Sequence, residues 1–253
     1  MSIVTGDQVA DPAESVQLGV VVLHPRDAVA AATGGADRLL LTIDPEDGHY
    51  SPEPAAVSAV VRETDLPVWV VLRTRQEDPL PKVRGGRLVT LGETFLELGA
   101  RGLAYGFVDR NLEIDREGCA EMCAELGGTP WMFHGFDQAL ETDRAWRDVR
   151  GLPGLESVIT AGSTRGLTHG ADELIATVSR DPRIAALVTA GGGLAPDVVP
   201  WLVRAGVRRF AIGSAARAGS SWTRGLVDVD RVRSWRMLVD DALSRALGIP
   251  VDD

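Results

Sequence analysis

Short apolar runs alternate with amphipathic segments along most of the chain. Such runs are typical of parallel strands that are buried on both faces of a sheet. The segments between them carry apolar residues three or four positions apart, which predicts helices; the last of these, 229–247, has Val232, Trp235 and Val239 on one face. The runs that we assign to strands are 17–23, 38–43, 67–73, 101–107, 129–133, 155–160, 184–189 and 208–212.

The spacing of these runs predicts the fold. The strands begin at intervals of about 20 to 35 residues, the repeat of a strand followed by a helix, and eight such units fill about 250 residues in a TIM barrel. The chain has 253 residues. We therefore predict an α/β protein, a (β/α)8 TIM barrel, with residues 1–253 in a single domain and 1–15 as a flexible acidic leader. A doubly wound sheet is the alternative, but no Gly-x-Gly-x-x-Gly turn follows the first strand.

Charge and composition narrow the range of partners. The chain is 45% hydrophobic and 25% charged, with a formal net charge of −10. A negative surface repels nucleic acid and anionic membranes, so we expect neither as a partner. No apolar run approaches the roughly 18 residues of a membrane span, and the N-terminal segment lacks the apolar core of a signal peptide. The protein is expected in the cytoplasm, and a homo-oligomer remains an open alternative.

Polar side chains follow the predicted strands. The carboxyl ends of parallel strands in a barrel meet at one rim, where catalytic residues collect. His134 and Asp137 follow run 129–133, and Asp109 follows run 101–107. A polar ring at the end of an apolar run needs a partner or a cavity, so we assign acid–base catalysis to His134 with Asp109 or Asp137. A helix cap or a turn is the alternative role for each aspartate.

A second group of residues at strand ends predicts a site for a small anionic molecule. Arg73 and Arg75 alternate along the chain, which directs both guanidinium groups to one side, and such groups bind carboxylate or phosphate in a bidentate way. Ion pairing with Asp44 or Asp109 is the alternative. Glycine turns after the last two strands resemble phosphate loops, which use backbone N–H groups. The predicted substrate-binding residues are Arg73, Arg75, Ser163, Gly191, Gly192, Gly193, Gly213 and Ser214.

Two further mechanisms depend on lysine and on metal ligands. Lys82 is the only lysine and lies outside the predicted strands, so a Schiff-base aldolase is not expected. A divalent metal ion held by carboxylate and imidazole would be compatible with acid–base chemistry. His24 and Asp44, each after a predicted strand, are the metal-ligand candidates. A turn before Pro25 and a helix cap are their alternative roles.

The two cysteines fit a structural role. Cys119, Met122, Cys123 and Leu126 recur at helical spacing, which places both thiols on the buried stripe of one helix. Free cysteine is among the most buried residue types, and two cysteines one turn apart on a helix are poorly placed for a disulfide. We therefore expect neither a disulfide nor a metal site there.

Six short motifs follow one another along the chain: Gly-Ala-Asp-Arg-Leu-Leu-Leu at 35–41, the run 67–75, Phe-Val-Asp at 107–109, Phe-His-Gly-Phe-Asp at 133–137, Val-Ile-Thr-Ala-Gly at 158–162 and Thr-Ala-Gly-Gly-Gly at 189–193. Taken in this order, they resemble the CutC family, named for copper homeostasis. The resemblance covers about residues 17–216 and implies a (β/α)8 barrel in which Arg73, Arg75, Asp109, His134 and Asp137 match positions at the rim. It also implies copper binding as a family property.

The departures from the family pattern bear on copper. Family glutamates of the first two strands are replaced by Gly19 and Leu40, and first-strand cysteines by Val21 and Val22. Cu(I) prefers thiolate or thioether ligands, and the predicted rim has none. We therefore favour a small-molecule enzyme of the lyase, isomerase or hydrolase type, acting by acid–base or divalent-metal-assisted chemistry on an anionic substrate. A non-catalytic copper-handling protein and a barrel without activity are the alternatives.

Overall fold

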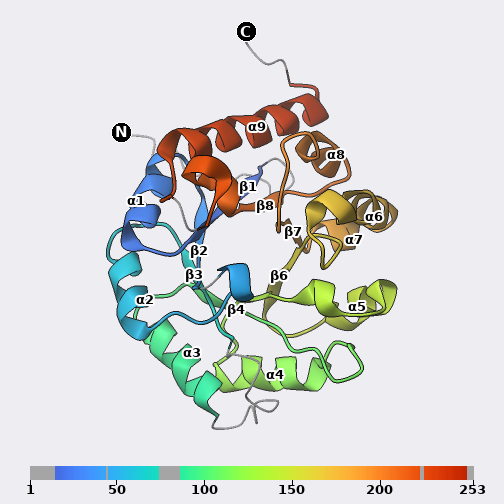
Figure 1. The fold of residues 1–253 in the computed structure, drawn as a ribbon. Coiled ribbons are helices and arrows are strands. Elements are labelled where there is room, and N and C mark those ends of the chain that lie inside the picture. Colours follow the sequence, from blue (N-terminus) through green and yellow to red (C-terminus); the bar gives the residue numbers. More distant parts are fainter. Residues whose placement is uncertain (1–14, 44, 74–85, 223–224, 250–253) are drawn as a thin grey trace, which may run out of the picture.

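The chain folds into a closed barrel of parallel strands surrounded by helices (Figure 1). The computed structural model describes residues 15–43, 45–73, 86–222 and 225–249. Each strand pairs with the next one in the sequence, and β1 pairs in parallel with β8 to close the ring. The predicted (β/α)8 TIM barrel is confirmed. The strands are β1 Gln17–Val22, β2 Arg38–Leu41, β3 Val68–Val71, β4 Gly102–Tyr105, β5 Trp131–Phe133, β6 Leu155–Thr160, β7 Val188–Ala190 and β8 Arg209–Ile212.

Helices cover the outside of the barrel (Figure 1). In the part of the chain that the structure describes, none of them is long and apolar enough to cross a membrane. One predicted strand start is wrong. Ile184 and Ala185 belong to a helical turn, because Asp181 caps the Arg183 amide and Pro182 fits the first helical turn. The helices are α1 Pro25–Thr33, α2 Pro54–Val61, α3 Arg87–Glu97, α4 Arg116–Glu125, α5 Thr142–Val149, α6 Leu167–Arg180, α7 Pro182–Ala185, α8 Val199–Arg204 and α9 Val229–Leu247.

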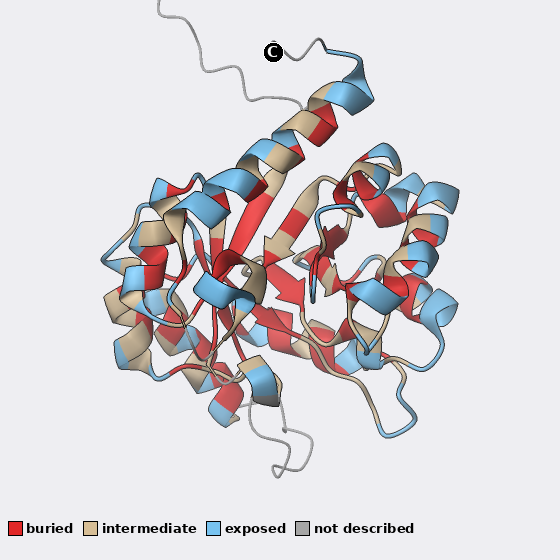
Figure 2. Cartoon of the chain, turned by 45° about the horizontal axis from the view of Figure 1, so that its top comes forward, coloured by how far each residue is buried: buried red, intermediate tan, exposed pale blue. Residues whose placement is uncertain are grey.

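Apolar side chains fill two layers. The larger lies between the strands and the helices, and buried positions face the strands while exposed ones face outward on each helix (Figure 2). The smaller lies inside the barrel and includes Val21, Leu40, Trp69 and Met132. The alternation of neighbouring strand residues between these two layers follows from the period of two along a strand. The barrel is therefore a packed core, and a cavity opens where the strands end.

Both cysteines lie in the helix layer, as predicted. Cys119 and Cys123 are free and buried on α4. Burial raises the pKa of the Cys119 thiol to about 12, and it also raises the pKa of Cys123. A thiol must lose its proton to become a nucleophile or a metal ligand. Cys119 and Cys123 therefore serve the packing of the core. Trp235 on α9 is also a buried core residue.

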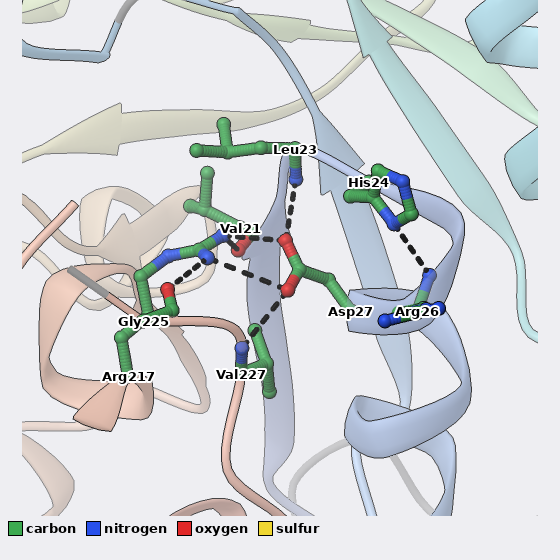
Figure 3. Close-up of polar contacts among 8 residues, drawn as sticks. All are labelled: Val21, Leu23, His24, Arg26, Asp27, Arg217, Gly225 and Val227. Atoms are coloured by element: carbon green, nitrogen blue, oxygen red, sulfur yellow. Dashed lines mark hydrogen bonds and ion pairs between the residues drawn. The ribbon is translucent and has the colours of Figure 1, made fainter. Parts of the chain in front are cut away.

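A buried ion pair joins the beginning of the barrel to its end (Figure 3). Asp27 on α1 is fully buried, and its Oδ2 accepts a hydrogen bond from Arg217 Nη2 at 2.7 Å. The Asp27 carboxylate also accepts from the amides of Leu23 and Val227, both at 2.9 Å. Arg217 donates to the Gly225 carbonyl at 3.0 Å. This network fixes the segment after β8 against α1, next to the carboxyl end of the barrel.

Candidate functional site

A cavity of about 610 Å³ opens at the carboxyl ends of the strands. Its walls include the interior apolar residues Val21, Leu40 and Ile159, and polar side chains and glycine turns surround them. This is where a TIM barrel places its chemistry. The predicted site residues that line the cavity are Arg73, His134, Asp137, Ser163, Gly191, Gly192, Gly193, Gly213 and Ser214.

Two imidazoles and one guanidinium group meet in this cavity. His134 follows β5, and its ring centroid lies 5.5 Å from that of His49 in an edge-to-face contact. His49 lies in the loop between β2 and α2, which the antiparallel bridge Ile43–Tyr50 closes. Arg73, just after β3, donates from Nη1 to the carbonyl of Gly48 at 2.9 Å and so ties this loop to the rim. The three side chains therefore come from three different connections, those after β2, β3 and β5.

Both imidazoles are neutral at physiological pH. Burial, with smaller contributions from the neighbouring His49 and Arg73, lowers the pKa of His134 to about 3. Burial lowers the pKa of His49 to about 4, again with help from Arg73. An environment that disfavours positive charge on both rings already contains one guanidinium cation. A negatively charged ligand would relieve this repulsion.

Asp137 supports the loop after β6. Its Oδ2 accepts from the Ala161 amide at 2.8 Å, and its Oδ1 accepts a short hydrogen bond from the Thr160 hydroxyl. Burial raises the pKa of this carboxyl, and the hydrogen bonds oppose that shift. The carboxylate oxygens are therefore engaged with β6 while the residue still borders the cavity. This geometry favours positioning over direct proton transfer.

The turns after β7 and β8 line the cavity with glycine and small residues. Gly192 and Gly193 have φ values of 77° and 88°, in the left-handed region that favours glycine. Within the described part of the chain, the amides of Gly193, Ser214 and Ala215 make no hydrogen bond with protein acceptors. Loops with free amides at these two strand ends bind phosphate in many TIM barrels. The predicted anion-binding turns are thus available to a ligand.

Gly213 has a different reason to be glycine. A Cβ atom there would lie 2.2 Å from the Trp222 ring, so only glycine allows the indole to lie on this turn. Trp222 lines the cavity and contacts the His49 ring, with 5.8 Å between centroids. The Trp222 ring centroid also lies 5.3 Å from the guanidinium carbon of Arg217. The cavity wall at Trp222 is therefore packed against Arg217 of the buried ion pair.

Two predicted residues lie away from the cavity. The Asp109 carboxylate accepts from the amides of Asn111 and Glu113 at 2.8 and 2.9 Å and does not line the cavity. His24 is exposed and caps α1, because its Nδ1 accepts from the Arg26 amide at 3.1 Å (Figure 3). In both cases a local turn uses the polar atoms. Asp44 and Arg75 lie outside the described residues.

The residues present do not fit a copper centre. Among the described residues no three His, Cys, Asp or Glu side chains come together as a possible metal site. The cavity offers the imidazoles of His49 and His134, which suit copper, but Arg73 places positive charge beside them. The thiols that Cu(I) prefers are buried on α4. A cation is thus opposed by the same group that attracts an anion.

His49 and Trp222 are the site residues that the strand-end rule misses. Both lie inside long connections, so their distance from a strand end in the sequence hides their position in space. His49 has a φ of 59°, rare for a residue other than glycine, and its buried Nδ1 has no hydrogen-bond partner in the described structure. The sequence signal for His49 is the Gly-His-Tyr segment at 48–50, where the imidazole directly follows a turn-forming glycine.

Comparison with known proteins gives a consistent family signal. The model of the CutC family matches residues 16–216. The human copper homeostasis protein cutC homolog is 28% identical over 194 residues, covering 73% of this chain and 68% of that protein. A family protein CutC of Xylella fastidiosa strain 9a5c is 25% identical and covers 94% of both chains. A crystal structure of a CutC protein from Streptococcus agalactiae has a TM-score of 0.67 at 18% identity, covering 78% of this chain and 98% of that one.

Proposed function

The chain belongs to the CutC family, and from that premise we propose that its cavity binds a small organic anion and transfers a proton on it with His134. The observation that carries this proposal is the convergence of Arg73, two neutral imidazoles and free backbone amides on one cavity. The proposed substrate is a carboxylate or a phosphate ester. The matching reaction classes are those of lyases, isomerases and hydrolases.

Arg73 supplies the charge that selects an anion. A guanidinium group in a partly enclosed cavity is worth more than one in water, because fewer water dipoles screen it. The amides of Gly193, Ser214 and Ala215 add donors from the other side of the cavity. A carboxylate or phosphate between these groups would accept charge-assisted hydrogen bonds, each worth about 1.5 to 3 kcal/mol.

His134 is the proposed acid–base group. A pKa of about 3 makes the ring a weak base in the absence of ligand. A bound anion would offset the repulsion from Arg73 and would raise the pKa of the ring towards the working pH. His49 would orient the His134 ring through their edge-to-face contact. Asp137 would take no part in the proton transfer and would hold the loop after β6 in position.

A binding experiment tests the proposal. Inorganic phosphate and malonate are titrated into the protein by calorimetry, and melting temperatures are measured with and without each anion. We expect both anions to raise the melting temperature of the wild type. The Arg73→Gln variant is expected to bind at least about 10-fold more weakly, because a charged hydrogen-bond partner is lost.

The matched control is Arg245→Gln, which removes an equally charged but largely exposed group on α9. This variant should bind both anions as the wild type does. Equal affinity of the wild type and of Arg73→Gln would contradict the proposal. A second result would also contradict the proposal: the protein binds neither anion but binds Cu(I) stoichiometrically through His49 and His134. Copper handling would then explain the cavity better.

A further inference from the structure

Two leucines stand exposed beside the mouth of the cavity. Leu112, in the loop after β4, has 46% of its surface exposed, and Leu140, in the loop after β5, has 69%. The Leu140 amide donates to the Leu112 carbonyl at 2.9 Å, which joins the two loops. We call this pair the leucine shelf. Single exposed leucines are ordinary, but two on neighbouring loops beside a cavity form an apolar surface in contact with solvent.

The loop after β4 is built to present Leu112. The antiparallel bridge Val108–Ile114 closes the loop, and the Asp109 carboxylate accepts from two of its amides. Leu112 itself has a φ of 58°. A branched side chain in the left-handed region is strained, and such strain persists where the surrounding structure enforces it, often at ligand sites. Asp109 is thus a positioning residue for the shelf.

A second hollow lies between the leucine shelf and residues that also line the main cavity. It has a volume of about 340 Å³ and is lined by Leu112, Leu140 and the buried ring of Phe136. Asp137 and Ser163 border this hollow and the main cavity alike. A molecule whose charged end lies near Arg73 would thus find an apolar surface next to the exit from the cavity.

We propose that the substrate is an amphiphilic anion whose apolar chain lies on the leucine shelf while its charged group occupies the main cavity. This inference rests on the proposed anion-binding function and narrows it to one class of substrate. Asp137 and Ser163 border both hollows, so the two hollows lie side by side, and this supports a single ligand that extends over both. The shelf then serves as the determinant of chain length, separate from the groups that bind the charge.

A series of alkyl phosphates tests the idea. Calorimetry measures the affinity of the full-length protein for inorganic, methyl, butyl and hexyl phosphate. Each added methylene that reaches the shelf is expected to tighten binding about twofold to fourfold, the range between partial and full burial. In the double variant Leu112→Asn, Leu140→Ser, we expect this dependence on chain length to disappear while the affinity for inorganic phosphate is unchanged. Asparagine is chosen because it tolerates the left-handed region.

The control is Leu247→Ser, which replaces a leucine of similar exposure on α9 and should keep the full dependence on chain length. If inorganic phosphate binds but all alkyl phosphates bind equally, the shelf is no substrate site and this inference fails alone. This inference also fails alone if the affinity of the double variant still depends on chain length. It fails likewise if the wild type sediments as a dimer and the double variant does not. Failure of every phosphate to bind removes the proposed function and this inference together.

Discussion

The ion pair between Asp27 and Arg217 gives the sharpest stability prediction. The change is Arg217→Met, which keeps the length and apolar stem of the side chain and removes the guanidinium group. Arg217 is 1% exposed and Asp27 is 0% exposed. The variant would leave a carboxylate buried without its cation, since the structure places Arg217 directly against it at 2.7 Å.

The expected loss follows from what remains around Asp27. Breaking a buried pair by removing one partner costs about 3 to 5 kcal/mol. The amides of Leu23 and Val227 still donate to the carboxylate, so we expect the lower end, about 3 kcal/mol. For a chain of this size, that corresponds to a melting temperature about 6 to 12 °C lower.

The assay is urea unfolding followed by tryptophan fluorescence and circular dichroism. The control Arg245→Met removes a guanidinium group from a surface pair with Asp241 and should leave the midpoint nearly unchanged. The double variant Asp27→Asn, Arg217→Met should be less destabilised than the sum of the two single variants, because it leaves no buried charge alone. A loss below about 1 kcal/mol in Arg217→Met, or strict additivity, would refute the reasoning.

Three further predictions concern buried groups. The pKa of His134 is about 3 in the folded protein and 6.5 as its ordinary value, so only the unfolded state takes up a proton in between. The wild type should lose stability as the pH falls from about 6.5 towards 4, and His134→Gln should lose about 3 kcal/mol less of its unfolding free energy over this range. Urea unfolding at the two pH values measures the difference, and an equal loss in both proteins would contradict the prediction. A thiol reagent should leave Cys119 and Cys123 intact at about pH 8 until urea unfolds the chain, and one reactive thiol per folded chain would show the burial to be wrong. Gly102→Ala should cost about 1 to 3 kcal/mol of unfolding free energy in urea, because the new methyl group would lie 2.4 Å from the Trp69 ring and 2.5 Å from the Pro130 carbonyl oxygen. An unchanged unfolding free energy would contradict the close packing at this position.

The fold could be predicted because its signal is periodic. Apolar runs buried on both faces recur at the repeat of a strand and a helix, and this repeat survives errors of several residues at each boundary. The predicted strand start at Ile184 was wrong for a local reason. Asp181 and Pro182, just before the apolar run, begin a helical turn that takes in its first two residues. Such capping depends on few residues and does not disturb the repeat.

The site could be predicted only where it lies next to a strand end. Arg73 and His134 follow their strands closely, so the barrel geometry carries them to the cavity. His49 reaches it through a loop that folds back, and no periodic pattern records that path. Asp109 shows the opposite failure, because it follows a strand yet turns its carboxylate towards its own loop. Where loop hydrogen bonds decide the direction of a side chain, the position of the residue in the sequence is a poor guide.

The contact between Asp27 and Arg217 has a consequence for how the protein is made. The two residues are 190 positions apart, and the last strand must close on the first before they can meet. At about 5 to 20 residues per second, a ribosome needs on the order of 10 to 40 s to add the intervening chain. Throughout that interval the nascent barrel has an open seam between its first and last strands. The cavity wall built on Trp222 is thus among the last parts to form, and a chain stopped before Arg217 would carry a charge on α1 that nothing neutralises.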